Sequence, residues 1–254
     1  MAWDFPRSLS LAERRARAER ERTKLQAKRE LRPVRAEGRT IARTFWGRAW
    51  CLNLESYSDY ASRLPRGRSY LRSGSVLDLQ VEPGRVVAQV SGTRLYQASV
   101  TVAAIPQRRW SALRRDCAGT IDSLVELLQG HLSGAVMERV CRQQTGLFPS
   151  PSEIAFRCSC PDQAAMCKHV AAVLYGIGVR LDQRPELLFE LRQVDAKELV
   201  AAAADGLPLA VKPLRPGRRL ELAGLSEMFG IEIAEADGEP PRTPGNRRSP
   251  RGRR

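Results

Sequence analysis

The sequence predicts an α+β protein, in which a small antiparallel sheet with helices is followed by a strand–turn–helix unit and short helices. Three observations lead to this expectation. Apolar and polar residues alternate in three short stretches between residues 77 and 102, helical spacing follows from residue 107, and cysteine and histidine gather between residues 158 and 169. A chain of 254 residues suffices for one or two domains with a substantial core.

The first segment, residues 1–38, is basic and highly charged. From Leu9 to Arg32 it is dominated by Arg, Glu, Ala and Leu, a composition that fits a solvated helix with i,i+4 charge pairs. It has too few apolar residues for a core helix, so disorder is the alternative, and Pro33 ends the pattern. We therefore expect this segment to be helical or disordered.

An α+β domain with a three-stranded meander is expected over residues 39–147. It begins with TFWGRAWCLNL, where Trp46 and Trp50 are four residues apart and share one face of a helix. Aromatic pairs at this spacing usually pack into a core. Cys51 beside them is expected to be a buried thiol.

Residues 62–74, SRLPRGRSYLRSG, combine arginines with one aromatic residue and three helix breakers. This composition suggests a basic loop or edge segment. Such a segment can hold a phosphate backbone and stack a base, although an exposed loop without function is the alternative. The candidate nucleic-acid contacts here are Arg66, Arg68, Tyr70 and Arg72.

The strongest strand signal follows. Leu77, Leu79 and Val81 alternate with polar residues, Pro83-Gly84 is a turn signal, and two further alternating stretches run from residue 86 to 90 and from 98 to 102. Short connections between such strands predict an antiparallel meander with one buried face.

Helices are expected after Pro106, over residues 107–116, 121–128 and about 132–140. Cys117 and Cys141 are expected to pack among them, and His131 to be a surface or capping residue rather than a ligand. The stretch 148–152, FPSPS, is a linker signal before the next unit.

Four potential metal ligands lie within twelve residues: Cys158, Cys160, Cys167 and His169, in a C-x-C-x6-C-x-H array. Alternate residues of a strand point to one face, so a strand from residue 154 directs the first two sulfurs to the same ion. Helical spacing after residue 169 places the last two ligands in the first turn of a helix. Three thiolates and one imidazole form a closed tetrahedral set, so we expect one structural zinc ion in residues 148–180.

This array, followed by the apolar helix HVAAVLYGIG, resembles the SWIM zinc finger, and roughly residues 39–232 resemble bacterial SWIM-containing proteins. The resemblance implies a ββα-like zinc fold that binds DNA or protein partners. It also implies association with SWI/SNF-type helicase-like ATPases.

The closed ligand set argues against an enzyme, because a catalytic zinc keeps an open position beside a general base. The sequence also has no Walker loop, no zinc-deaminase signature and no Gly-x-Ser-x-Gly elbow. A metal hydrolase stays the minority hypothesis, and it would require an open coordination position.

The net charge of +14 points to an anionic partner. Residues 1–50 hold 14 basic and 6 acidic side chains, residues 239–254 hold 6 and 1, and the middle is nearly neutral. Arg157 and Lys168 flank the ligands and are the first candidates for phosphate contacts. We expect a nucleic-acid partner, with DNA favoured over RNA. The alternative is a protein–protein adaptor whose zinc only shapes a docking surface.

Short helices are expected over residues 181–232 and a basic disordered tail over residues 233–254. Asp182 with Pro185 resembles a helix start, and Asp195 with Glu198 resembles a capping box. The sequence contains no apolar run long enough for a membrane span and no secretory signal at its start, so a cytoplasmic location is expected.

Overall fold

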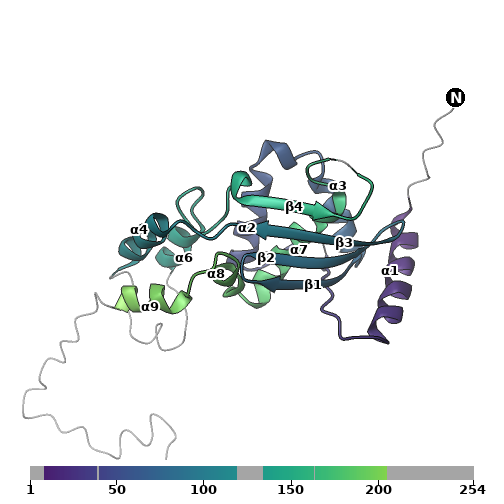
Figure 1. Cartoon of the computed structure of the whole chain (residues 1–254), viewed down its shortest axis with the longest axis horizontal. Helices are drawn as coiled ribbons and strands as arrows, with labels where there is room; N and C mark the ends of the chain where they lie inside the picture. Colours follow the sequence, from purple (N-terminus) through teal and green to yellow (C-terminus); the bar gives the residue numbers. More distant parts are fainter. Residues whose placement is uncertain (1–8, 39, 119–133, 163, 205–254) are drawn as a thin grey trace, which may run out of the picture. The chain divides into compact units, whose positions relative to one another are not determined.

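A four-stranded antiparallel sheet, in the order β1-β2-β3-β4, carries the fold (Figure 1). The computed structural model describes residues 9–38, 40–118, 134–162 and 164–204. The strands are β1 (Val76–Glu82), β2 (Arg85–Ser91), β3 (Leu95–Val102) and β4 (Ile154–Cys158). The helices are α1 (Leu11–Gln26), α2 (Phe45–Glu55), α3 (Leu64–Arg72), α4 (Gln107–Cys117), α6 (Gly134–Cys141), α7 (Lys168–Gln183), α8 (Leu187–Leu191) and α9 (Ala196–Ala204), with short 3-10 turns η1 (Ser58–Tyr60) and η2 (Pro151–Glu153).

The predicted α+β class and the three-stranded meander are confirmed. Strands β1 and β2 are joined through Pro83 and Gly84, whose φ of +69° is a conformation that glycine adopts without strain. Strand β4 then pairs antiparallel with β3, Phe156 lying opposite Val100. The strand expected at residue 154 therefore extends the meander and is part of the same sheet.

Helix α7 is the central element of the core. It is buried along almost its whole length and packs against α2, α3 and the inner face of the sheet. Close helix approach depends on glycine: a Cβ on Gly67 of α3 would lie 2.6 Å from the Ala171 Cβ of α7, and a Cβ on Gly178 of α7 would lie 2.9 Å from the Cys51 sulfur of α2. The buried indole of Trp50 donates to the Leu174 carbonyl oxygen at 2.8 Å.

The aromatic helix predicted at the start of the domain is confirmed as α2. The Thr44 hydroxyl caps it by accepting from Gly47 N–H at 3.4 Å. Trp46 and Cys51 are buried as expected, and burial, followed by the nearby Glu55 carboxylate, raises the pKa of Cys51 to about 12.

The N-terminal charged segment forms a helix, α1. Its capping box joins Ser10 and Glu13, and Arg17 pairs with Glu21 one turn later at 3.1 Å. Only Ala18 is buried along this helix. Helix α1 lies against β1 and β2, and with one buried residue it adds little apolar surface to the core.

The segment expected as a basic loop or edge, residues 62–74, is instead largely helix α3. Pro65 lies in its first turn, where a missing backbone N–H is tolerated, so this proline starts the helix instead of breaking it. Gly67 allows the close approach to α7, and Gly74 follows the helix end with a φ of +73°. Each predicted breaker thus has a place in this helix: Pro65 at its start, Gly67 at its contact with α7 and Gly74 after its end.

The linker expected at residues 148–152 is part of the core instead. Phe148 is 1% exposed and its ring meets that of Trp50 edge to face, with centroids 5.8 Å apart. Residues 151–153 form η2, which leads directly into β4. Proline and serine here shape a turn between two packed elements, so the elements on both sides belong to one hydrophobic core.

Of the two helix starts predicted after residue 180, the one at Asp195 is confirmed by α9 and the one at Asp182 is wrong. Asp182 lies inside α7, and its carboxylate accepts from the backbone N–H groups of Arg43 and Thr44 at the start of α2. Asp195 accepts from Lys197 N–H at 2.8 Å, but Glu198 binds the Trp110 indole N–H at 2.9 Å instead of closing a capping box.

The helix at residues 107–116 is confirmed as α4, and α6 covers most of the helix expected near residues 132–140. The helix expected at 121–128, His131, the part of the expected helical region beyond residue 204 and the tail 233–254 lie outside the described residues. Among the described helices, none is long and apolar enough to cross a membrane.

Candidate metal centre

The four predicted ligands come together in space. One ligand atom from each of Cys158, Cys160, Cys167 and His169 lies within 4.8 Å of every other. The first cysteine ends β4, the second lies in the turn that follows, and the remaining two ligands lie at the start of α7. The sequence-based ligand assignment is thus realised as one cluster at the junction of strand, turn and helix.

Local structure explains how the sulfurs are directed. Cys158 lies opposite Ala98 of β3 on the inner face, and the ladder continues one residue further, where Ser159 N–H donates to Gln97 O at 2.9 Å. The alternation therefore directs residues 158 and 160 to the same side. Cys167 is the N-cap of α7, its sulfur accepting from Val170 N–H at 3.5 Å, so the positive end of the helix favours its thiolate.

His169 directs its Nδ1 atom toward the cysteines. Nδ1 lies 3.9 Å from the sulfurs of both Cys158 and Cys167. The ring packs against Tyr96 at a centroid distance of 4.5 Å and meets Tyr70 edge to face at 5.2 Å. The position of Nδ1 identifies it as the ligating nitrogen.

The other ring nitrogen of His169 has an unusual environment. Nε2 is buried and has no hydrogen-bond partner among the described residues. It faces Gly92 at the end of β2, where a Cβ would lie 2.9 Å from it. The imidazole is therefore oriented by packing against two tyrosine rings and a glycine, rather than by a hydrogen bond to Nε2.

The thiols share their protons unequally. A hydrogen bond from Cys158 is the main cause that lowers the pKa of Cys167, to about 3, while the same hydrogen bond and burial raise the pKa of Cys158. Burial also raises the pKa of Cys160. In the metal-free chain one thiolate is thus held by neighbouring thiols, and a bound cation replaces their protons.

The donor set fits a zinc ion. Three sulfurs and one imidazole nitrogen are ligands that zinc prefers, and four of them close a tetrahedron. Sulfurs at the Zn–S bond length of about 2.3 Å are about 3.8 Å apart in a tetrahedron, comparable to the mutual distances of the cluster. The chain therefore binds a single structural Zn²⁺ through these four residues.

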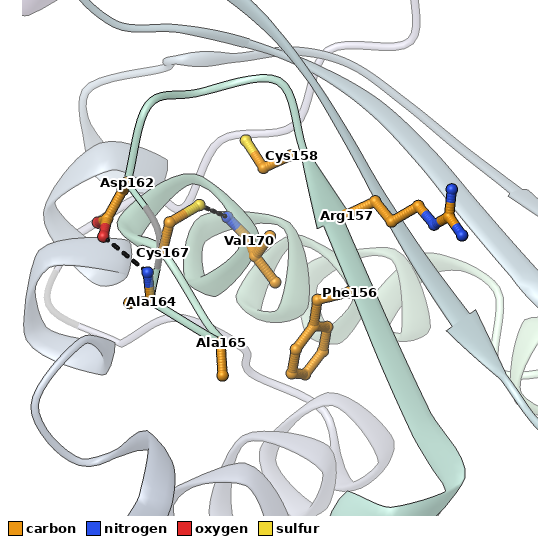
Figure 2. Close-up of a pocket in the computed structure, with 8 residues that line it drawn as sticks. All are labelled: Phe156, Arg157, Cys158, Asp162, Ala164, Ala165, Cys167 and Val170. Atoms are coloured by element: carbon orange, nitrogen blue, oxygen red, sulfur yellow. Dashed lines mark hydrogen bonds between the residues drawn. The ribbon is translucent and has the colours of Figure 1, made fainter.

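A cavity of about 430 Å³ adjoins the cluster, between β4 and the turn that leads to α7 (Figure 2). Phe156, Ala165 and Val170 give it apolar walls, and two of the metal ligands, Cys158 and Cys167, form one end. The cavity thus extends from the metal cluster to residues of β4 and of the turn that do not bind the metal.

The predicted nucleic-acid residues do not form one patch. Tyr70 is 7% exposed and packs on His169, so its ring is not available for stacking on a base. Arg66 is exposed on the flank of α3 near Tyr70, whereas Arg68 pairs with Glu55 at 3.3 Å on another flank. Arg72 lines a surface pocket together with Arg68.

Arg157 and Lys168 also separate. Arg157 is exposed and points away from Cys158 and Cys167, toward the outer face of the sheet (Figure 2). Lys168 instead places its ammonium 5.5 Å from the Tyr70 ring centroid.

Three residues that sequence reasoning missed contribute here. The Arg14 guanidinium of α1 lies 5.2 Å from the Tyr70 ring centroid, on the same ring as Lys168. Tyr96 and Gly92 hold His169. The alternation that runs back from Val102 through Ala98 already places Tyr96 on the inner face, but nothing in the sequence joins the first helix to the finger.

Comparison with known proteins agrees with this site. Residues 157–176 match the family model described as SWIM zinc finger. The chain is 34% identical over 173 residues to "Uncharacterized protein Rv2102" of Mycobacterium tuberculosis (strain ATCC 25618 / H37Rv), over 65% of this chain and 62% of that protein's length. The chain thus spans less than two thirds of this relative. No solved structure matches the chain. The match and the clustered ligands together identify residues 157–176 as a SWIM zinc finger.

Proposed function

We propose that this zinc-binding chain is a non-catalytic nucleic-acid-binding protein, with DNA as the favoured partner. The observation that carries the proposal is a basic face in which α1, α3, the β2–β3 turn and the start of α7 meet around Tyr70. We define the basic face by five residues: Arg14, Arg17, Arg66, Arg94 and Lys168.

Hydrogen bonds between these elements support the assembly of this face. Arg14 donates to the Ser69 hydroxyl of α3 at 2.9 Å, and Arg17 donates to the Thr93 carbonyl oxygen in the β2–β3 turn at 2.6 Å. Arg94 follows that turn residue and is exposed. Arg66 lies one helical turn before Tyr70. Glu21 of α1 pairs with Arg17 at 3.1 Å.

The chemistry of this face suits phosphates more than bases. Guanidinium and ammonium groups bind phosphate oxygens and release counterions. The two aromatic rings beneath it, Tyr70 and Tyr96, are buried against His169 and offer no surface for base stacking. The expected binding is steeply salt-dependent and weakly selective for sequence.

The non-catalytic assignment rests on the closed ligand set. When all four protein ligands bind a tetrahedral zinc ion, no coordination position is open for a water molecule or substrate. The SWIM resemblance adds one finer proposal, that the chain serves a SWI/SNF-type helicase-like ATPase as an accessory. That partnership is tested by binding between the purified chain and such an ATPase, with and without DNA.

The test of nucleic-acid binding uses the full zinc-loaded chain, because α1 contributes two residues of the basic face. Duplex and single-stranded DNA and RNA are titrated over a salt series. The variant Arg14→Gln/Lys168→Gln is expected to bind about 10-fold or more weakly and to reduce the slope of log K against log salt by about 2.

The matched control is Arg108→Gln/Arg115→Gln, which removes two exposed positive charges from α4, away from the basic face. If both double variants lose the same affinity, binding is unspecific attraction to net charge. If neither the wild type nor the control binds any nucleic acid, the adaptor hypothesis replaces the proposal.

A further inference from the structure

Among the described strands, β4 has a hydrogen-bonded neighbour on one side only, which is β3. Ser159 N–H donates to Gln97 O and Ala103 N–H donates to Glu153 O, both at 2.9 Å, so the odd-numbered residues of β4 face β3. The backbone N–H and C=O groups of Phe156 therefore point away from the sheet. Within the described residues, neither of these two groups has a hydrogen-bond partner.

The cavity of about 430 Å³ lies beside this free edge. Phe156 and Ala165 face each other across it, and Val170 of α7 lies between them at greater depth (Figure 2). Phe156 is only partly buried, its ring meeting that of Tyr60 edge to face. An unpaired strand edge and an apolar cavity thus occur side by side, which is the combination that strand-addition sites use.

The charged side chain that has no ion-pair partner near this edge, among the described residues, is a cation. Asp162, on the far wall, is engaged by Arg63 at 3.3 Å and accepts from Ala164 N–H at 3.2 Å. Arg157 is exposed and forms no ion pair with any described residue. A segment added beside β4 would therefore meet one unsatisfied cation.

We propose that the free edge of β4 binds an extended segment of another protein by strand addition. Neighbouring residues of the added strand point to opposite faces. One residue therefore directs an apolar side chain into the cavity beside Phe156, and its neighbour directs an acidic side chain toward Arg157. The partner is an extended peptide of alternating apolar and acidic residues. This interaction does not require the basic face or nucleic-acid binding.

The experiment uses the full zinc-loaded chain labelled with ¹⁵N and an acetylated, amidated peptide Thr-Glu-Val-Glu-Val-Glu-Thr. Saturable shifts of the amide signals of residues 154–158 are expected at peptide concentrations up to the millimolar range. A peptide of identical composition with its valines adjacent is the control, and it is expected to bind at least 10-fold more weakly because its side chains do not match the alternation.

Backbone pairing is tested by Phe156→Pro against Phe156→Ala. Both variants lose the ring, but only proline loses the outward N–H, and an edge position tolerates proline because its N–H is not used by the ladder. The proline variant is expected to bind at least 10-fold more weakly than the alanine variant. A second test does not depend on whether the proline variant folds. Two peptides are compared, one N-methylated at the backbone nitrogens that face β4 and one at the alternate nitrogens that face away. Only the first is expected to lose affinity.

The charge requirement is tested by Arg157→Glu. This variant is expected to bind the glutamate peptide at least 10-fold more weakly, but to bind a peptide with serine in place of each glutamate with unchanged affinity. The proposal is overturned by an absence of saturable shifts, by equal binding of the rearranged peptide, or by peptide shifts confined to the basic face. Shifts of the β4 amide signals on addition of an oligonucleotide, in place of the peptide, would also overturn it.

Discussion

His169 illustrates how single residues are arranged around the metal. Its Nδ1 faces the thiols, and its Nε2 is buried against Gly92 between two tyrosine rings. Histidine ligands usually donate their second N–H to an oxygen, which fixes the ring orientation. Here the ring orientation depends on close packing, so the size of the residue at position 92 matters directly for metal binding.

The variant Gly92→Ala is expected to weaken zinc binding about 10- to 100-fold, the range found for residues that orient ligands. The added methyl group would lie 2.8 Å from Tyr96 Cε2 and 2.9 Å from His169 Nε2, so the imidazole must move. Zinc affinity is measured by competition with a chromophoric chelator, and the visible spectrum of the cobalt-substituted protein reports the geometry. Gly134→Ala, where a Cβ meets nothing within 4 Å, is the control. Equal affinities for the two variants would refute this role.

Cys160 tests the ligand set itself. The variant Cys160→Ser is expected to lose stoichiometric zinc, because a serine hydroxyl replaces one of four closing ligands. Metal analysis of the purified protein gives the zinc content. Cys141→Ser is the control, since Cys141 lies in α6 outside the cluster. A Cys160→Ser protein with one tightly bound zinc would contradict the assignment.

Among the elements, the junction between β3, β4 and α8 depends on one buried ion pair. Arg192, which follows α8, is 0% exposed; it donates to Glu153 at the start of β4 and to the Ala103 carbonyl oxygen after β3, both at 2.8 Å. Arg109 of α4 also reaches Glu153, at 3.2 Å. This carboxylate therefore connects elements that are far apart in the sequence.

The variant Glu153→Gln is expected to lower the free energy of unfolding by about 3–5 kcal/mol, because it leaves a buried guanidinium without its counter-charge. Chemical denaturation of the zinc-loaded protein measures this change. Glu186→Gln is the control: its pair with Arg184 is more than half exposed on both sides, so a change of about 0–1 kcal/mol is expected. Similar effects of the two substitutions would show that burial of the pair does not matter.

Acid is expected to remove the same stabilisation. Burial tends to raise the pKa of Glu153, but hydrogen bonds from Arg192, Ser150 and Arg109 outweigh it and lower the pKa from 4.5 to about 2. Because the folded-state pKa is the lower one, the contribution is complete above about pH 4.5 and is lost as the pH falls toward 2. The stability difference between wild type and Glu153→Gln should shrink over this range. Comparing the two proteins at each pH cancels the effect of zinc release, and a constant difference would contradict the assignment.

In the molecule as a whole, the zinc finger and the meander share one core. Strand β4 is hydrogen-bonded to β3, and α7 packs against the sheet and against two helices that precede it in the sequence. Structural zinc stabilises finger peptides by about 10–16 kcal/mol near neutral pH. In this chain that free energy also supports the strands and helices that contact β4 and α7.

Removal of zinc by a chelator is therefore expected to destabilise the whole described core and not only residues 154–180. Far-UV circular dichroism and tryptophan fluorescence, to which the buried Trp46, Trp50 and Trp110 contribute, should show one coincident transition at a lower Tm. The buried indoles lie in α2 and α4, so they are independent of the finger segment in the sequence. A meander that survives chelation, with unchanged fluorescence, would contradict this prediction.

Much of this protein is determined by its sequence locally. Alternation specified β1 to β3, the helical spacing of Trp46 and Trp50 specified α2, and the C-x-C-x6-C-x-H array specified the metal ligands. These patterns are readable because strand and helix periodicity and ligand spacing depend only on neighbouring residues.

The tertiary structure alone decided how these parts combine. Pro65 and Gly67 predict a loop in the sequence but lie in α3. Pro65 is in the first turn of that helix, and Gly67 lets α3 pack closely against α7. Likewise, β4 joins the meander, and Tyr70 packs on His169 instead of being exposed to a nucleic-acid base. Arg14 of the first helix lies over the Tyr70 ring. Contacts between residues far apart in the chain depend on which faces pack together, and no local pattern encodes that choice.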